Sequence, residues 1–267
     1  MSQSPPIVLT IAGFDPSSGA GVTADIKTIA AHGCYGVSAI TALTVQSTAG
    51  VRGVFPVDPK LLVHTLEELQ RDVKVSAVHI GVLGSREVIS VVADFLREAR
   101  LKNVVLDPVF RSSSGAALLD EPGIRLMVQR LLPLADVITP NVDEAAALTG
   151  LEMKDPAQMK LAAARMHEMG AKSVVVTGGH LSQAIDMLSV KGDQVQTYRA
   201  DRVDSPNTHG TGCAFSTAIA CQLALGQSLP MAVLLAKAYV LAAIKNSYSI
   251  GHGPGPVNHL DWRKDGC

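Results

Sequence analysis

The segment Asn207–Cys213, with the sequence N-T-H-G-T-G-C, has the residue types best suited to binding a phosphate. It opens an alanine-rich stretch with helical character. Glycines at a helix start let a ligand approach the backbone, and the free N–H groups and the helix dipole favour an anion there. Thr211 adds a hydroxyl, and Cys213 falls in the first turn, where the same positive field is expected to lower its thiol pKa. The lysine and spacing of a Walker A loop are absent, and an ordinary glycine turn beside a buried cysteine is the alternative.

A second glycine- and serine-rich segment runs from Gly13 to Gly21, and Asp25 follows one turn into the next predicted helix. Such a turn between a strand and a helix suits a nucleotide phosphate or a small polar substrate. Its glycines do not have the spacing of a dinucleotide-binding fingerprint. A flexible surface turn is equally consistent with this segment alone.

Acidic residues after two predicted strands have the chemistry of magnesium ligands. Asp107 precedes Pro108, and Glu144 lies three residues after Asn141, so that Asn141 and Glu144 share one face of a first helical turn. Mg²⁺ prefers such hard oxygen donors and keeps several waters. The structural alternative is a helix cap formed by Asn141 and Glu144, which the residues alone favour, with Asp107 as a turn acid.

Three further features have less specific signals. Lys237 lies in an otherwise apolar helix and is expected to extend its amine to solvent. His209 is a candidate catalytic group, although a structural histidine bonded to the backbone is favoured. Gly251–His259 is too rich in glycine and proline for a helix or strand, and forms either a loop over the edge of a site or a plain tail.

The elements that must position these residues alternate between short β-branched runs, such as Ile7–Ile11 and Val75–Ile80, and longer helical stretches. This alternation predicts βαβ units with a mostly parallel sheet. We expect one three-layer α/β/α domain over residues 1–267, with flexible tails at 1–6 and 261–267. Ligands of such folds collect at the carboxyl ends of the strands, where the residues above are found.

Other segments complete this pattern. A turn signal at residues 191–193 predicts a hairpin between Ile185–Val190 and Gln194–Ala200. Further apolar runs cover Ser38–Thr44 and Val51–Val57.

The composition excludes several classes of protein. Lys and Arg number 23 against 24 Asp and Glu, so the near-neutral chain lacks the basic balance of a nucleic-acid binder. Hydrophobic residues make up 47% and the mean hydropathy is +0.25, but no run approaches the roughly 20 apolar residues of a membrane span. The start lacks a secretory signal and the four cysteines are irregularly spaced, so a cytoplasmic protein with free thiols is expected.

Eight blocks follow one another along the chain: L-T-I-A-G-F-D-P-S-S-G-A-G (9–21), T-A-L-T-V-Q-S-T (41–48), I-G-V-L-G (80–84), L-D-P-V (106–109), I-T-P-N-V-D-E-A (138–145), T-G-G-H (177–180), N-T-H-G-T-G-C (207–213) and G-H-G-P-G-P-V-N-H (251–259). Together they closely resemble the hydroxymethylpyrimidine/phosphomethylpyrimidine kinases of thiamine biosynthesis, in the ribokinase superfamily. The resemblance covers about residues 7–260. It implies a ribokinase-like fold, a homodimer, and phosphoryl transfer from Mg-ATP to 4-amino-5-hydroxymethyl-2-methylpyrimidine and then to its monophosphate.

The resemblance also assigns residues to roles. The amides of Gly210, Thr211, Gly212 and Cys213 would form the anion hole for the transferred γ-phosphoryl group. Cys213 stands where the wider superfamily has an aspartate base, and acts either as the base or by positioning the hydroxymethyl group. The implied pyrimidine pocket consists of Gly13, Ala20, Gln46, Val82 and Val109, with Val82 where the family usually has methionine. The implied ATP-binding residues are Asp107, Asn141, Glu144, Thr177, Gly179 and Lys237, of which Asp107 and Glu144 would hold Mg²⁺, partly through water.

Two alternatives stay open. A pyridoxal or pyridoxine kinase of the same superfamily shares the G-T-G-C motif, but Gln46 favours a pyrimidine, because pyridoxal kinases of this type tend to lack it there. An amide also presents both a donor and an acceptor, which suits an aminopyrimidine edge. A pyrimidine-binding or regulatory protein without turnover is the other. Asn141, Glu144 and the segment Gly210–Cys213 argue against it.

Overall fold

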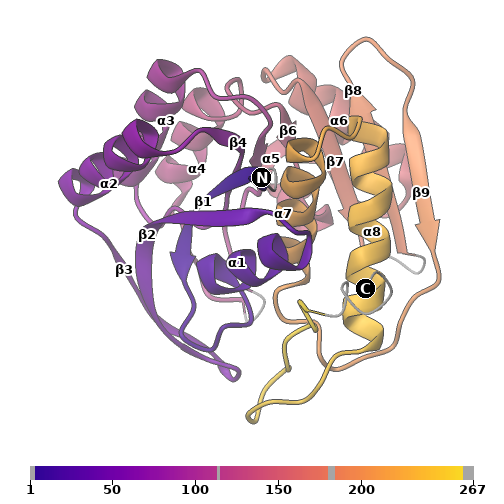
Figure 1. Cartoon of the computed structure of the whole chain (residues 1–267). Helices are drawn as coiled ribbons and strands as arrows, with labels where there is room; N and C mark the ends of the chain where they lie inside the picture. Colours follow the sequence, from indigo (N-terminus) through magenta and orange to yellow (C-terminus); the bar gives the residue numbers. More distant parts are fainter. Residues whose placement is uncertain (1–3, 113–114, 180–183, 261–267) are drawn as a thin grey trace.

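The structure, a computed structural model, describes residues 4–112, 115–179 and 184–260. Its centre is a nine-stranded sheet with the strand order β3-β2-β1-β4-β5-β6-β7-β8-β9 (Figure 1). The strands are β1 (Ile7–Phe14), β2 (Tyr35–Ser47), β3 (Gly50–Pro56), β4 (Val75–Ile80), β5 (Val104–Leu106), β6 (Val137–Ile138), β7 (Ser173–Gly178), β8 (Ala184–Val190) and β9 (Gln196–Ala200). Pairing is parallel from β2 to β7, whereas β3 at one edge and β8 and β9 at the other are antiparallel.

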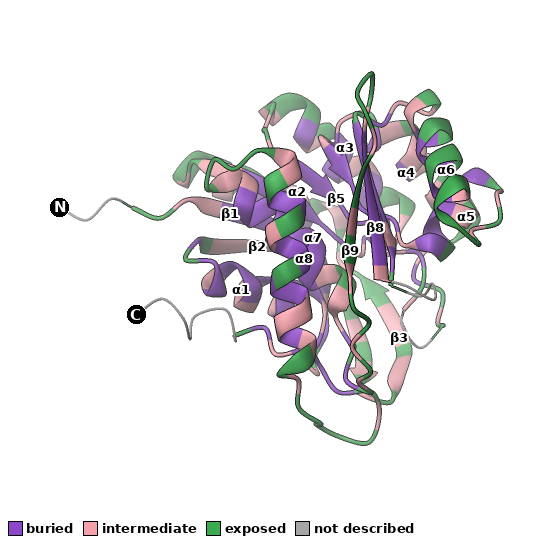
Figure 2. Cartoon of the chain, turned by 90° about the vertical axis from the view of Figure 1, so that its right-hand side faces the viewer, coloured by how far each residue is buried: buried purple, intermediate pink, exposed green. Residues whose placement is uncertain are grey.

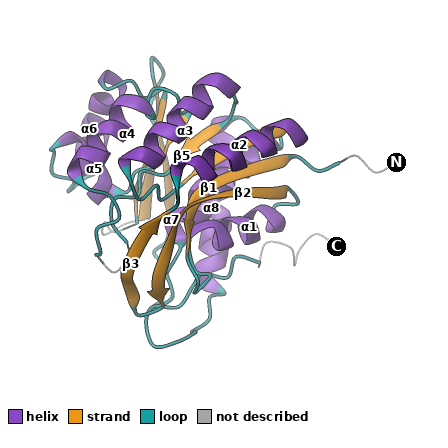
Figure 3. Cartoon of the chain, turned by 90° about the vertical axis from the view of Figure 1, so that its left-hand side faces the viewer, coloured by secondary structure: helices purple, strands orange, loops and turns teal. Residues whose placement is uncertain are grey.

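Helices cover both faces of the sheet, so the predicted three-layer α/β/α architecture is confirmed (Figure 3). One face carries α1 (Gly21–Ala31), α7 (Thr211–Ala224) and α8 (Leu229–Lys245), whose apolar side chains form one core cluster with the strands. The other face carries α2 (Pro59–Asp72), α3 (Arg86–Ala99), α4 (Glu121–Arg130), α5 (Val142–Thr149) and α6 (Pro156–Glu168).

The central strands are buried on both faces, as Figure 2 shows by colour. Val8, Leu9 and Ile11 of β1 have no exposed surface. A strand enclosed in this way needs apolar residues at successive positions instead of an alternating pattern. This requirement explains why the aliphatic composition of the chain predicts a large parallel core.

The predicted hairpin between β8 and β9 is confirmed. The runs predicted over Ser38–Thr44 and Val51–Val57 belong to a second antiparallel pair, β2 and β3, and β2 extends to Ser47. This extension places Gln46 inside a strand. Of the tails predicted as flexible, residues 1–3 and 261–267 lie outside the described residues, and the Pro6 carbonyl accepts a hydrogen bond from the Tyr35 N–H. No described helix has both the length and the apolar character needed to cross a membrane.

Candidate functional site

The start of α7 has the open backbone that the sequence predicts. Gly210 is its N-cap with a φ of 83°, and among the described residues no side chain caps the helix. A side chain at Gly210 would clash with the Gly19 carbonyl, so this close approach requires glycine. The Thr211 hydroxyl donates to the Thr208 carbonyl, 2.6 Å away, so its proton points back along the chain. The Thr211 N–H donates to the same carbonyl at 3.2 Å. The capacity of the helix start to bind an anion therefore rests on its other backbone N–H groups.

The thiol of Cys213 differs from its predicted state. Its pKa is raised well above the ordinary value, so the predicted lowering is wrong. Burial of the thiol is the main cause, and the carboxylates of Asp107 and Asp25 add to it. The Gly21 N–H, which donates to the sulfur, only partly offsets these effects. Cys213 is therefore a neutral thiol beside the helix start, and the helix field alone does not make it a thiolate.

Two buried carboxyl groups, Asp107 and Glu144, lie near the helix start. Burial raises the pKa of Asp107 to about 6, and burial followed by repulsion from Asp107 raises the pKa of Glu144 well above its usual value. A Cβ added at Gly212 would lie 3.9 Å from Asp107 Oδ2, so Asp107 borders the helix start directly. Two hard oxygen donors that repel each other fit a divalent cation, which would relieve the repulsion. The part of the chain that the structure describes holds no cluster of three or more His, Cys, Asp or Glu side chains arranged as metal ligands.

Asn141 and Glu144 form a capping box at the start of α5, which confirms the structural alternative. Asn141 Oδ1 accepts from the N–H groups of Asp143 and Glu144, both at 2.9 Å. In return, Glu144 Oε2 accepts from the Asn141 N–H at 2.9 Å. This box fixes the Glu144 carboxyl where α5 begins, beside the end of β6.

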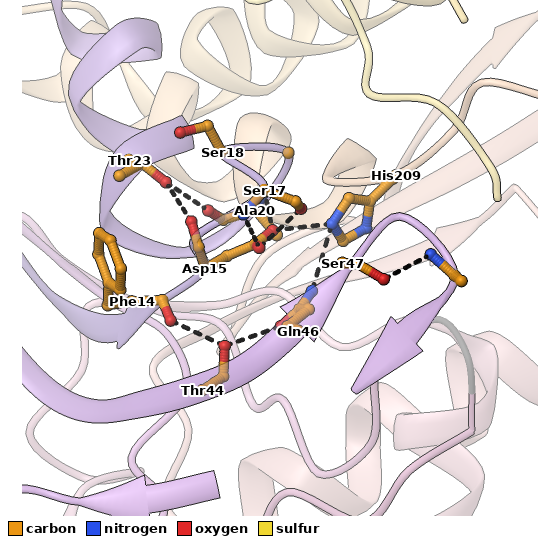
Figure 4. Close-up of polar contacts among 12 residues, drawn as sticks. Phe14, Asp15, Ser17, Ser18, Ala20, Thr23, Thr44, Gln46, Ser47 and His209 are labelled. Carbon is orange, nitrogen blue, oxygen red and sulfur yellow. Dashed lines mark hydrogen bonds and ion pairs between the residues drawn. The ribbon is translucent and has the colours of Figure 1, made fainter. Parts of the chain in front are cut away.

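A second polar cluster joins the loop after β1 to the residue before Gly210 (Figure 4). His209 Nε2 lies 2.9 Å from Asp15 Oδ2, and its side chain is only 10% exposed. Asp15 also accepts from the Ser17 N–H and hydroxyl and from the Ala20 N–H, at 2.7 to 2.9 Å. The ring of His209 thus pairs with a carboxylate, a partner that the prediction of a structural histidine bonded to the backbone does not include. The sequence pattern does not single out Asp15, although its place inside the glycine-rich loop is a signal for it.

Gln46 lies beside this cluster. Its Nε2 atom is 3.4 Å from His209 Nε2, and its Oε1 atom is 3.2 Å from the Thr44 hydroxyl (Figure 4). Gly13 faces the Val82 side chain, because a Cβ at Gly13 would lie 3.5 Å from Val82 Cβ. The fold thus brings the predicted pyrimidine residues to the ends of β1, β2 and β4.

Val109 is the fifth residue of the predicted pocket. Its N–H donates to the Asp107 carbonyl over 2.9 Å, and the residue is half-buried. This bond forms a tight turn after β5 that keeps Val109 beside Asp107.

Lys237 is buried, so its predicted extension to solvent is wrong. Its Nζ atom lies 2.7 Å from Asp186 Oδ2 on β8 and donates to the Ala184 carbonyl at 3.1 Å. Asp186 Oδ1 in turn accepts from the Gly178 N–H at 3.2 Å. The pair therefore fixes the end of β7, from which the predicted nucleotide residue Gly179 follows.

Thr177 and Gly179 lie at the same edge of the sheet as Asn141. The Thr177 N–H donates to the Pro140 carbonyl at 2.9 Å, and Thr177 forms a parallel bridge with Asn141. Gly179 is exposed, and an added Cβ there would meet nothing within 4 Å. These residues leave open backbone beside the capping box.

The segment Gly251–His259 folds over the edge of the site, which confirms that alternative over a plain tail. The His209 N–H donates to the Gly255 carbonyl at 3.1 Å, and the His209 carbonyl accepts from the Val257 N–H at 3.2 Å. Gly253 N–H donates to the Thr48 hydroxyl at 3.2 Å. The segment therefore ties the start of α7 to the end of β2.

The mostly parallel sheet, its two helical layers and the glycine-led helix start at its edge define an α/β protein with a ribokinase-like fold. The chain belongs to the phosphomethylpyrimidine kinase family, which it matches over residues 15–258.

Similarity to individual proteins supports this family assignment. The hydroxymethylpyrimidine/phosphomethylpyrimidine kinase of Haemophilus influenzae is 43% identical over 257 residues, which cover 94% of this chain and 96% of the relative. The ADP complex of a pyridoxal kinase from Bacillus subtilis superimposes with a TM-score of 0.89 at 36% identity, covering 97% of this chain and 99% of that one. A phosphomethylpyrimidine kinase structure from Clostridium difficile has a TM-score of 0.80 at 38% identity, covering 90% of this chain and 99% of that one.

Proposed function

We propose that this chain is an ATP-dependent kinase of thiamine biosynthesis that phosphorylates hydroxymethylpyrimidine and then its monophosphate. One observation carries the proposal. The amide of Gln46 lies 3.4 Å from the ring of His209, and His209 directly precedes the open helix start at Gly210. A group that recognises an aminopyrimidine edge therefore lies next to a group that accepts a phosphoryl anion.

The proposed chemistry relies on position and charge. The N–H groups of Gly210, Thr211, Gly212 and Cys213 would receive the transferred γ-phosphoryl group, where water-excluded donors are most effective. The Thr211 N–H would exchange its bond to the Thr208 carbonyl for this contact. The neutral Cys213 thiol supports a role in positioning the hydroxymethyl oxygen. As that oxygen bonds to the γ-phosphorus, the bond between phosphorus and the β–γ bridging oxygen breaks, ADP leaves, and the hydroxyl proton passes to an oxygen of the transferred phosphoryl group. The substrate pocket in this proposal is formed by Gly13, Ala20, Gln46, Val82 and Val109.

The proposed nucleotide-binding site lies at the ends of β5, β6 and β7. Asp107 and Glu144 would hold Mg²⁺, partly through water, and the ion would neutralise charge on the ATP phosphates. The ATP-binding residues would be these two together with Asn141, Thr177, Gly179 and Lys237. The ADP complex of the related pyridoxal kinase supports a nucleotide in this fold.

A pyridoxal kinase is the second candidate, because close structural neighbours carry that name. Parallel assays of hydroxymethylpyrimidine and pyridoxal with Mg-ATP separate the two. We expect a higher kcat/KM for the pyrimidine, and a preference for pyridoxal would overturn the proposal. Pyrimidine binding without ATP consumption would indicate a binding protein instead.

We also propose a homodimer, as the family resemblance implies, and a cytoplasmic location, as the irregularly spaced cysteines favour. Leu43 and Phe55 pair across β2 and β3 and are 50% and 60% exposed, which leaves apolar surface for a second copy. Light scattering coupled to gel filtration is expected to give about twice the 28.0 kDa chain mass. A mass of one chain would contradict this part of the proposal.

A further inference from the structure

A fully buried carboxylate lies behind the candidate site and is not among the residues proposed to contact the substrate or the nucleotide. Asp25 on α1 has no exposed surface. Its Oδ2 atom accepts from the Thr10 hydroxyl at 2.6 Å, and its Oδ1 atom accepts from the Thr217 hydroxyl at 2.9 Å. His79 Nδ1 is a third neighbour, 3.2 Å from Oδ2. Asp25 is therefore a fully buried carboxylate whose two oxygens both have hydrogen-bond partners.

His79 leads from this carboxylate toward the site. The residue is on β4 and is also fully buried. Its second ring nitrogen, Nε2, lies 2.9 Å from the Ser216 hydroxyl on α7. That hydroxyl lies 3.2 Å from Asp107 Oδ2. A continuous polar chain thus runs from Asp25 through His79 and Ser216 to Asp107, which borders the helix start at Gly212.

The donor and the acceptor of each hydrogen bond in this polar path can be assigned by starting from Asp25. Asp25 only accepts, so His79 Nδ1 carries a proton. Burial alone would lower the pKa of His79, but the charge of Asp25, the hydrogen bond to it and the charge of Asp107 together outweigh burial and raise the pKa, which favours a second proton on Nε2. With Nε2 donating to Ser216, the single hydroxyl proton of Ser216 is available for Asp107.

Ser216 has competing acceptors in its own helix. Its hydroxyl lies 3.0 Å from the Gly212 carbonyl and 3.2 Å from the Cys213 carbonyl. Serine in a helix ordinarily bonds back to such carbonyls. The His79 ring holds the serine oxygen from the other side, and this keeps the oxygen beside Asp107.

Packing of the core does not explain why these four buried polar side chains are present. A buried ion pair contributes little net stability compared with apolar side chains of similar volume. A path of hydrogen bonds that ends on the Asp107 carboxyl can instead fix the orientation of that carboxyl at the reaction site. We propose that His79 is a positioning residue, which acts through Ser216 to hold Asp107 in place at the phosphate-binding helix start. The inference rests on the proposed function, because it assumes that phosphate binds there.

The test compares variants along the chain with one matched control. His79→Leu and Ser216→Ala each break the path to Asp107, and His79→Gln retains an amide that can donate to Ser216. Thr217→Val is the control, because it removes another donor to Asp25 and leaves the path through His79 intact. The measurements are kcat, the KM of the pyrimidine, Mg-ADP affinity by calorimetry, and urea unfolding.

We expect His79→Leu and Ser216→Ala to lower kcat by at least about tenfold, with the pyrimidine KM within about twofold of wild type. Both should weaken Mg-ADP, and His79→Gln should recover part of the loss. The double variant His79→Leu/Ser216→Ala should be no slower than the slower single variant, because both act on one path. Thr217→Val should lower stability and leave kcat and Mg-ADP affinity within about twofold of wild type.

Equal loss of kcat in Thr217→Val, or multiplied losses in the double variant, would overturn the inference. If His79→Leu does not fold, Ser216→Ala and His79→Gln still decide it. Failure of the proposed function is a separate result, seen as wild-type protein that does not phosphorylate the pyrimidine. In that case the Mg-ADP affinities alone decide the inference, and affinities unchanged from wild type would contradict it.

Discussion

His209 Nε2 lies 2.9 Å from Asp15 Oδ2, although the two residues are 194 positions apart in the chain. This pair joins the glycine-rich loop after β1 to the start of α7. It thereby connects the side of the site that holds Gln46 to the side that offers backbone N–H groups. The spacing between substrate and phosphate in the proposed reaction depends on this connection.

Asp15→Asn should therefore lower both the affinity for the pyrimidine and the stability of the protein. We expect a loss of about 2 kcal/mol in the free energy of unfolding, because a buried charged hydrogen bond is replaced, and a higher pyrimidine KM. Urea unfolding and steady-state kinetics measure the two effects. Asp58→Asn, at the N-cap of α2, is the control whose KM should not change.

The stability effect of Asp15 should depend on pH. Burial alone would raise the pKa of Asp15, but hydrogen bonds from His209 and Ser17 outweigh it and lower the pKa. A carboxyl with a lowered folded-state pKa stabilises the protein fully above its unfolded pKa, and loses this effect as the pH falls through the folded value. The difference between wild type and Asp15→Asn should narrow below about pH 4. A difference that grows with acid would count against the pair.

Cys213 should react slowly with iodoacetamide. Burial and the nearby carboxylates raise the pKa of its thiol, so little thiolate is present at pH 7.5. Mass spectrometry of the Cys213 peptide over time measures the rate, with Cys213→Ser as the control for assigning the peptide. Alkylation as fast as that of free cysteine would show that the helix field dominates after all.

Cys213→Ala should lower turnover strongly and leave the fold intact. A neutral thiol that positions the hydroxymethyl oxygen can be replaced in part by a hydroxyl, so Cys213→Ser should retain more activity than Cys213→Ala. Steady-state kinetics and circular dichroism test both variants. Unchanged turnover in Cys213→Ala would remove the residue from the proposed chemistry.

Asp107→Asn should stabilise the metal-free protein while it impairs turnover. The pKa of Asp107 is raised to about 6, so the folded state binds its proton more tightly than the unfolded state does. Stability therefore falls as the pH rises from about 4 to above 6, and the full penalty is present at pH 8. We expect Asp107→Asn to gain about 2 kcal/mol at pH 8 in EDTA, and almost nothing at pH 4. A less stable variant at pH 8 would contradict this account of the carboxyl.

Lys237→Met should destabilise the protein by about 3 kcal/mol, because it leaves the buried Asp186 carboxylate without its cation. Lys237→Met/Asp186→Leu removes both charges and should be more stable than the single variant. Urea unfolding of these two variants and of Asp186→Leu completes a double-mutant cycle. Independent, additive losses would show that the 2.7 Å contact contributes nothing.

Much of the fold follows from local sequence patterns. The bounds of β4 (Val75–Ile80) are those that the sequence predicts, because a run of buried β-branched residues is a local signal. The extension of β2 to Ser47 was missed. Residues 43–47 alternate between exposed and half-buried positions at the sheet edge, so they lack the apolar run of a buried strand.

The site was less predictable, because its energetics depend on residues brought together by the fold. Lys237 meets Asp186 from 51 positions away, and no helical pattern on α8 reveals a carboxylate on β8. The position of Cys213 at a helix start, which would lower its thiol pKa, can be predicted from the sequence. The carboxylates that raise this pKa come from α1 and from the end of β5, and the fold alone brings them near the thiol. The cap formed by Asn141 and Glu144 was predictable, since both partners lie within one turn.

The most direct measurement of the central claim is a crystal structure with hydroxymethylpyrimidine and a non-hydrolysable ATP analogue bound. The account predicts the pyrimidine edge on the Gln46 amide and the γ-phosphate on the amides of residues 210–213. The hydroxymethyl oxygen should then lie between that phosphate and the Cys213 thiol. A pyrimidine bound away from Gln46, or a γ-phosphate away from the start of α7, would contradict it.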